Sequence, residues 1–219
     1  MNQQQKRIME SVAKEVEQKL ANEGSGHDWW HVARVQNLAR HIGRKEKADL
    51  FVVELAALLH DIADWKFHNR DETVGPKVAG AILEKNNVAN ETIASVRSII
   101  ANMSYKGAGS KTKMKTIEGE IVQDADRLDA IGAIGIARVF AYGGYSNRSM
   151  HDPNTRPALR QTKEEYFKNN STSINHFYEK LLLLKDRLNT QTAKKIAKER
   201  HAFMQKYLKK FFEEWKGKN

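Results

Sequence analysis

Residues 48–63, ADLFVVELAALLHDIA, form the most apolar stretch of this 219-residue chain. The stretch is long for a strand, and Glu54, Leu55, Ala56 and Leu58 are good helix formers. Because its apolar residues occupy nearly every side of a helix, the helix would be surrounded by other parts of the protein. We therefore predict a buried central helix here.

Helical patterns continue on both sides of this segment. Apolar residues recur three or four positions apart, which is the spacing of one helix face. No segment reads as a strand, and 3 Pro and 13 Gly are few for a fold built on many turns. The further helices that we expect cover about residues 4–22, 29–44, 76–86, 90–103, 117–129, 131–142, 162–188 and 191–215, with the longest loop at 143–160.

These patterns predict an all-α fold with no linker that divides the chain. We expect a single domain, residues 1–219, with its core at about 20–188 and a C-terminal amphipathic helix at about 191–215. The apolar stripe expected to pack this last helix on the body consists of Ile196, Phe203, Tyr207, Phe211 and Trp215.

Composition excludes several classes of protein. Hydrophobic residues make up 40% of the chain, which is enough for a core and excludes disorder over most of its length. The chain has no cysteine, so disulfides, thiolate metal sites and cysteine nucleophiles are excluded. The first residues lack the apolar region of a secretory signal, and no stretch is long enough to span a membrane. We therefore predict a cytoplasmic protein with no membrane partner.

The net charge of +10 is concentrated near the C-terminus, where residues 190–219 hold nine Lys or Arg and three Glu. Such a charge attracts phosphate-bearing partners, either nucleotides or nucleic acid, although solvated lysine-rich helix faces are a commoner cause. No helix-turn-helix or zinc-finger spacing is present, so nucleic acid is not the expected partner. The oligomeric state is not set by these patterns.

Three groups of polar residues could carry chemistry: 26–31 (GHDWWH), His60-Asp61 at the end of the apolar run, and 124–129 (DADRLD). A charged Asp61 is costly to bury without a partner. The partner could be a nearby Lys or Arg in a salt bridge. It could instead be a metal ion, because imidazole and carboxylate are natural metal ligands.

Taken in this order, the three groups resemble the HD-domain metal-dependent phosphohydrolases, whose pattern is one His, a later His-Asp pair and a distant Asp. The chain looks closest to the bacterial single-domain branch of nucleotide (pyro)phosphohydrolases. That branch carries GHDWxH and DADRLDAIGAIGIAR, which stand here at residues 26–31 and 124–138. The resemblance runs from about residue 20 to 215.

The resemblance implies an all-helical fold and one divalent metal ion (Mn, Mg, Co or Ni) held by His31, His60, Asp61 and Asp126. It also implies hydrolysis of a phosphate ester or anhydride, with Asp61 and Asp64 as catalytic residues. A carboxylate beside the metal, such as Asp64, can take a proton from water, but Asp64 could equally be a surface residue that starts the next loop.

Substrate contacts are expected from side chains that can donate to phosphate: His27, Arg127, His68, Lys106 and Arg148. Each has an ordinary alternative. His27 could cap a helix with Asp28, Arg127 could lock Asp126 or Asp61, and the others could be solvated loop residues. Trp29, Trp30 and Trp65 are expected to pack in the core, although they could instead stack on a base.

The predicted function is cleavage of a (deoxy)nucleoside triphosphate to monophosphate and pyrophosphate. A nucleoside monophosphate phosphatase is the next alternative, followed by a guanosine polyphosphate hydrolase. Asp64-Trp65 argues mildly against the last, because alarmone enzymes resembling this chain carry an adjacent acidic pair there. An alternative of another class is a metal-stabilised nucleic-acid-binding module that uses the basic tail.

Overall fold

The computed structural model describes residues 1–21, 28–63, 71, 73–103, 113–159 and 171–218. Within these ranges the chain is helical and contains no strand, so the predicted all-α class is confirmed. The described residues divide into two compact units, the first reaching to Asp126 and the second beginning at Arg127, inside one helix. The single-domain organisation stays a prediction.

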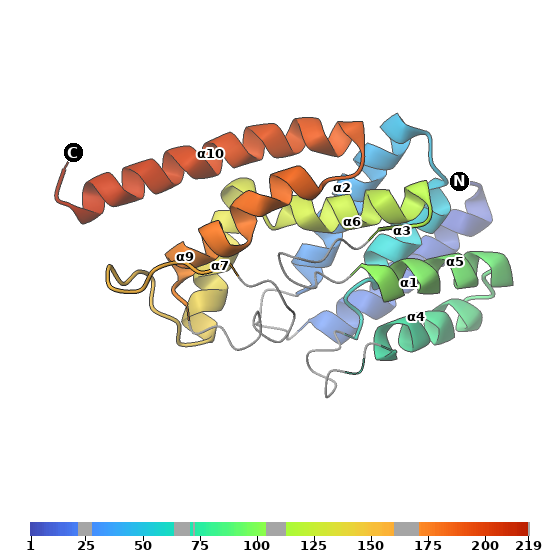
Figure 1. Ribbon diagram of the computed structural model, residues 1–219. Coiled ribbons are helices and arrows are strands. Elements are labelled where there is room, and N and C mark those ends of the chain that lie inside the picture. Colours follow the sequence, from blue (N-terminus) through green and yellow to red (C-terminus); the bar gives the residue numbers. More distant parts are fainter. Residues whose placement is uncertain (22–27, 64–70, 72, 104–112, 160–170, 219) are drawn as a thin grey trace. The chain divides into compact units, whose positions relative to one another are not determined.

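The first unit is built around α3 (Leu50–Leu59). This helix packs against α1 (Gln3–Leu20), α2 (Trp29–Glu46) and α5 (Asn90–Asn102), while α4 (Val74–Lys85) pairs with α5 (Figure 1). The unit also holds α6 (Ile117–Asp129) as far as Asp126.

Burial of α3 agrees with its sequence, since every residue from Phe51 to Leu59 is buried. The helix begins where the Asp49 side chain accepts hydrogen bonds from the backbone N–H groups of Phe51 and Val52. Such a cap satisfies donors that a helix leaves unpaired at its start. The predicted central helix is therefore confirmed, with its neighbours on several sides.

The second unit contains α7 (Gly132–Tyr145), α9 (Ser173–Glu179), a 3₁₀-helix η2 (Leu181–Arg187) and α10 (Gln191–Trp215). The last helix packs against α7 and η2, and α9 packs against η2 and α7. Among the described helices of the whole chain, none is both long enough and apolar enough to cross a membrane.

Two expectations for the second unit are wrong in detail. The described part of 162–188 is not one helix, because the backbone at Lys180 leaves helical geometry (φ −142°, ψ −58°) and separates α9 from η2. On α10 the fully buried row is Ala193, Ala197, Met204 and Leu208. Phe203 and Trp215, which were expected in the buried stripe, are about half exposed, at 51% and 47%. Tyr207 of the expected stripe does pack inward, against the rings of Phe140 and Phe177.

Candidate metal centre

His31 is placed by the start of α2. Asp28 is the N-cap residue, and its Oδ1 accepts a hydrogen bond of 2.8 Å from the backbone N–H of His31. A side-chain cap of this kind determines where the helix begins and therefore which way its first-turn side chains point. The alternative that Asp28 caps this helix is confirmed.

His60 and Asp61 lie directly after α3. The helix was expected to continue to residue 63, but it ends at Leu59, and the Ile62 N–H donates to the Leu59 carbonyl in a tighter turn. His60 is the C-cap residue and keeps helical dihedral angles, and residues 60–63 form a turn. The end of the most apolar helix thus presents two adjacent ligand-type side chains.

Asp126 comes from α6, where its side chain is 39% exposed. Its neighbours behave differently. Asp124 is fully buried, and Asp129 is buried and accepts a 2.7 Å bond from Arg138. Of the three acidic residues in 124–129, Asp126 is the most accessible from solvent.

Four side chains from these three elements of the first unit come together. The two histidine Nε2 atoms are 3.2 Å apart, and Asp61 Oδ2 lies 3.3 Å from that of His31 and 3.5 Å from that of His60. Asp126 Oδ1 lies 3.6 and 3.9 Å from the same two nitrogens. Ligand atoms about 2.1 Å from one ion are about 3.0–4.2 Å from one another, depending on coordination geometry. The distances suit a single metal ion.

The chemistry of the donors also fits a cation. His60 Nδ1 is 2.8 Å from the Ala57 carbonyl oxygen, which can only accept, so this nitrogen carries a proton. In the neutral ring Nε2 then has a free lone pair, and it points at the cluster. Two imidazole nitrogens and two carboxylates form a ligand set typical of divalent transition metals and Mg²⁺.

Exposure changes across the cluster. The His31 and His60 side chains are 0% and 3% exposed, whereas those of Asp61 and Asp126 are 16% and 39% exposed. An ion held here would be anchored from the buried histidine side, and water or substrate could reach it from the carboxylate side. A catalytic metal site requires such an open position.

The predicted substrate contacts fall into two groups. His27, His68 and Lys106, together with the predicted catalytic Asp64, lie outside the described residues. Arg127 and Arg148 belong to the second unit. Arg127 donates to the Arg187 carbonyl, and the Arg148 guanidinium lies 5.8 Å from the centre of the Tyr142 ring. The roles of these residues remain predictions.

Trp30 corrects one expectation about packing. It was expected in the core, yet it is 66% exposed, although it directly precedes the fully buried His31. Adjacent helix residues point about 100° apart, so one can face the interior while the next faces solvent. Trp29 is partly buried, and Trp65 lies outside the described residues.

One group of polar residues was not anticipated from the sequence. Glu54 is fully buried in the middle of α3, and its Oε2 accepts hydrogen bonds from Arg40 (2.6 Å) and Gln36 (3.1 Å) of α2. The available signal was a single charged residue inside an otherwise apolar run. Burial of a charge requires a partner, but the sequence did not say which residue that was.

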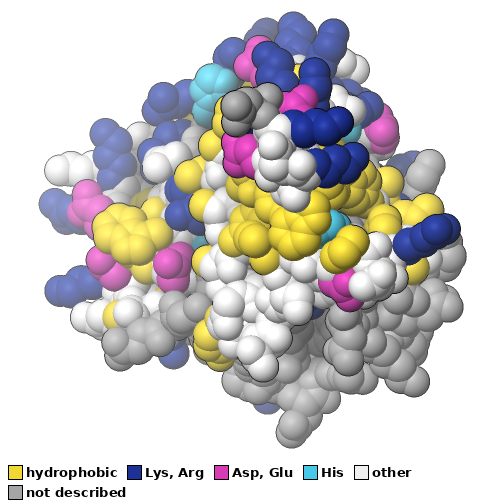
Figure 2. Space-filling view, turned by 90° about the vertical axis from the view of Figure 1, so that its left-hand side faces the viewer, with side chains coloured by type: hydrophobic (Ala, Val, Ile, Leu, Met, Phe, Trp, Pro, Cys, Tyr) yellow, Lys and Arg dark blue, Asp and Glu magenta, His cyan; other side chains and the backbone are white. Residues whose placement is uncertain are grey.

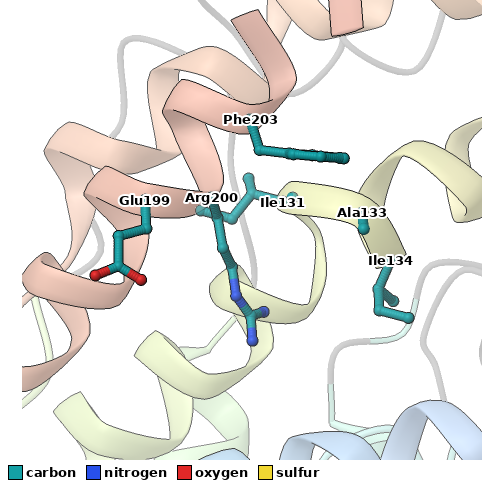
Figure 3. Close-up of a pocket in the computed structure, with 7 residues that line it drawn as sticks. Ile131, Ala133, Ile134, Glu199, Arg200 and Phe203 are labelled. Carbon is teal, nitrogen blue, oxygen red and sulfur yellow. The ribbon is translucent and has the colours of Figure 1, made fainter. Parts of the chain in front are cut away.

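A pocket of about 300 Å³ lies in the second unit, and none of the predicted site residues that the structure describes lines it. Its lining residues are Ile131, Gly132, Ala133, Ile134, Glu199, Arg200 and Phe203. Figure 3 shows Phe203 of α10 and Ile134 of α7 on its two sides. Gly132 has φ +79°, and a Cβ there would lie 2.9 Å from the Arg200 side chain, whose guanidinium donates to the Leu128 carbonyl. The absence of a side chain at Gly132 therefore allows Arg200 of α10 to pack closely on the start of α7.

Comparison with known proteins identifies the family. The HD-domain family model matches residues 29–131, which include all four clustered side chains. YpgQ of Bacillus subtilis is 42% identical over 203 residues, covering 91% of this chain and 90% of YpgQ. A crystal structure of YpgQ in complex with ADP has a TM-score of 0.74 at 36% identity, covering 94% of this chain and 97% of that one.

Two further crystal structures are similar over nearly the full length. A Lactobacillus plantarum protein has a TM-score of 0.85 at 36% identity and covers 99% of both chains. An HD-superfamily hydrolase from Bacillus thuringiensis has a TM-score of 0.76 at 42% identity, covering 97% of this chain and 98% of that one. The resemblance noted from the motifs is confirmed, and the chain belongs to the HD-domain family of hydrolases.

Proposed function

We propose that this protein is a metal-dependent phosphohydrolase that cleaves (deoxy)nucleoside triphosphates to monophosphate and pyrophosphate. The observation that carries the proposal is the convergence of His31, His60, Asp61 and Asp126 within distances that suit one ion. Phosphate esters and anhydrides are the substrates that such a Lewis-acid centre activates well.

A nucleotide as substrate is supported by the similarity to YpgQ, which has been crystallised with ADP. The positive net charge of +10 favours an anionic ligand over a neutral one. Arg127 and Arg148 are proposed to contact phosphate through their guanidinium groups. His27, His68 and Lys106 are proposed as further phosphate contacts.

The metal ion, when bound, would polarise a phosphoryl oxygen and make a water molecule more acidic. His31 and His60 would hold the ion through Nε2, and the proton on His60 Nδ1, shared with the Ala57 carbonyl, keeps that ring in the required tautomer. Asp61 and Asp126 would offset the positive charge while leaving the exposed side open. We propose Mn²⁺, Mg²⁺, Co²⁺ or Ni²⁺ as the ion.

Asp64 is proposed as the group that accepts the proton of the attacking water at its carboxylate. In Asp64→Asn the side chain keeps its size but cannot act as a base. We expect kcat to fall by roughly 10²–10⁴-fold with metal affinity nearly unchanged. Asp61→Asn is the matched control, because it should weaken metal binding and turnover together. Wild-type turnover in Asp64→Asn would remove Asp64 from the mechanism.

The function is tested with purified protein, nucleoside mono-, di- and triphosphates, guanosine polyphosphates and a series of divalent metals. Phosphate and pyrophosphate are assayed separately. We expect pyrophosphate release from triphosphates, loss of activity in EDTA and recovery with one metal. Release of phosphate alone would favour the monophosphatase alternative. No turnover of any phosphorylated compound by metal-loaded protein would contradict the proposal.

We further propose that the protein acts in the cytoplasm on a small-molecule nucleotide, without a membrane or nucleic-acid partner. A gel-shift assay with duplex and single-stranded DNA and RNA at two salt concentrations tests the second part. Tight binding that weakens steeply with salt would favour the binding-module alternative.

A further inference from the structure

Glu54 is a buried charged residue that the proposed chemistry does not use. Its side chain is 1% exposed and lies in α3, where every other residue from Phe51 to Leu59 is apolar. Arg40 and Gln36 of α2 both donate to Oε2. The other oxygen, Oε1, is buried and has no hydrogen-bond partner among the residues that the structure describes.

The buried Glu54 and its two partners are not expected to add much to the stability of the fold. A buried charge loses its hydration, and an unsatisfied carboxylate oxygen adds to that cost. Arg40 remains 34% exposed, and its pKa is raised mainly by the hydrogen bond to Glu54. Apolar side chains of similar volume would fill the same space without an unpaired oxygen. The presence of Glu54 is therefore better explained by its effect on the position of α2 than by a contribution to stability.

Contacts along α2 and α3 show an antiparallel register. At one end His31 meets the His60-Asp61 pair, and in the middle Gln36 and Arg40 meet Glu54. At the other end Gly43 meets Leu50, whose Cδ2 would lie 2.9 Å from a Cβ added at Gly43. Residue numbers rise along one helix as they fall along the other, so the polar contact in the middle sits between the metal ligands and the close helix contact.

We propose that Glu54 is a positioning residue which, with Gln36 and Arg40, sets the axial register of α2 against α3 and so brings His31 and His60 together. The inference rests on the metal centre of the proposed function. Aliphatic side chains pack well in several axial positions, whereas hydrogen bonds at 2.6 and 3.1 Å tolerate little sliding.

A metal site tolerates only small changes in the distances between its ligand atoms, smaller than the shift of a helix that slides by one residue. A slide of one residue moves a helix by about 1.5 Å. The two Nε2 atoms are 3.2 Å apart, so such a slide would change their separation by a large fraction. The contacts of Gly43 and Glu54 would fix the position of the α2 backbone along α3. The His31 side chain could then move only by changing its rotamer.

The experiment compares Mn²⁺ affinity by calorimetry in wild-type protein and Arg40→Met/Glu54→Met. This double variant removes both charges together, so no uncompensated buried charge remains, and we expect it to fold with an unchanged or higher Tm. We expect Mn²⁺ to bind about 10–100-fold more weakly, as with other residues that orient metal ligands. A folded double variant that binds Mn²⁺ as tightly as wild type would overturn the proposal.

The control removes the charges of another ion pair of the same unit, Glu15–Lys85, whose atoms are 3.2 Å apart and whose side chains are 24% and 72% exposed. Glu15→Gln/Lys85→Met should bind Mn²⁺ like wild type, and equal weakening in both double variants would overturn the proposal. If the Met pair does not fold, Glu54→Gln decides: it keeps an acceptor for Arg40 but loses the charge, so we expect about 3–10-fold weaker binding, and unchanged binding overturns the proposal.

Failure of this inference differs from failure of the proposed function. Wild-type protein that binds Mn²⁺ and releases pyrophosphate, with a double variant that binds equally well, overturns only the role of Glu54. Wild-type protein that binds none of the four metals overturns both, because no metal centre would then exist to be positioned. Wild-type protein that binds Mn²⁺ but hydrolyses no nucleotide leaves the positioning role standing when the double variant binds more weakly.

Discussion

Helices α3 and α10 carry charge in opposite ways. In α3 nine consecutive residues are buried, and the polar side chains in or just after it are Glu54, His60 and Asp61. Each of these has a partner close by. In α10 only four residues are buried, and its lysines are largely exposed. Lys209 and Lys210 make long contacts of 4.0 and 3.8 Å to glutamates one turn on.

The difference shows how burial changes the meaning of a charged residue. On α10 water solvates the lysines, and exposed ion pairs of this kind contribute little to stability. Figure 2 shows many Lys and Arg side chains standing out from the surface in this way. On α3 water is excluded, so each charged or polar group requires a built partner. The predictions below test this contrast, from the largest expected effect to the smallest.

The largest effect is expected from His60→Ala. The substitution removes one Nε2 ligand from the cluster, the atom that lies 3.5 Å from Asp61 and 3.9 Å from Asp126. Loss of residues that only orient ligands costs about 10–100-fold in metal affinity, so loss of a ligand should exceed ~100-fold. Calorimetry with Mn²⁺ measures the affinity. His201→Ala on α10 is the control and should bind Mn²⁺ normally; similar losses in both variants would contradict the assignment.

A large loss of stability is expected from Leu58→Ala. Leu58 is fully buried in α3, and truncation of such a side chain leaves a cavity that costs about 2–5 kcal/mol. Chemical denaturation measures the free energy of unfolding. A loss below about 1 kcal/mol would mean that the surroundings of α3 collapse into the gap, contrary to a well-packed central helix.

A smaller effect depends on pH. Burial, helped by the positive charges of Lys180 and Arg148, lowers the pKa of His176 to about 3. Between pH 7 and pH 5 the folded ring therefore stays neutral while the unfolded ring, with its ordinary pKa near 6.5, takes up a proton. The unfolded state binds more protons, so stability falls as pH falls, by about 2 kcal/mol at pH 5.

His176→Gln isolates this contribution, because glutamine does not titrate. The free energy of unfolding of wild type and variant is measured at pH 7 and pH 5. We expect the wild-type protein to lose about 2 kcal/mol more than the variant over this interval. Parallel losses in the two proteins would show that His176 is not the group responsible.

The smallest effect is expected from Lys210→Ala on α10. Its contact to Glu214 is 3.8 Å long, and both side chains are more than half exposed. Such pairs contribute about 0–0.5 kcal/mol, and salt screens them. Denaturation at low and high salt measures the change. A loss greater than about 1 kcal/mol would mean that the charges of α10 are structural, and the contrast with α3 would fail.

Local pattern was enough to predict most helices, whereas the ligand set was implied by the family resemblance and stays a prediction. Apolar spacing predicted α2, α5 and α6 to within about two residues of their observed ends. The end of α3 was predicted four residues too late, because the apolar residues Ile62 and Ala63 follow His60-Asp61 while the backbone already turns there. The α10 stripe was wrong in part: Phe203 and Trp215 are about half exposed, whereas Tyr207 lies against the rings of Phe140 and Phe177. Spacing alone does not say which apolar residues of a helix face the protein interior.

The order of His31, His60-Asp61 and Asp126 in the sequence determined which residues are candidates and which family the chain resembles. Periodicity and residue type are local properties, and they carry over directly into helices and ligand chemistry. Only the tertiary structure decided that these atoms lie 3.2–3.9 Å apart, that Asp126 is the exposed acid of its segment, and that Glu54 faces Arg40 and Gln36. The reason is physical: which side chains meet across two helices depends on their crossing and register, which packing sets and no single helix encodes.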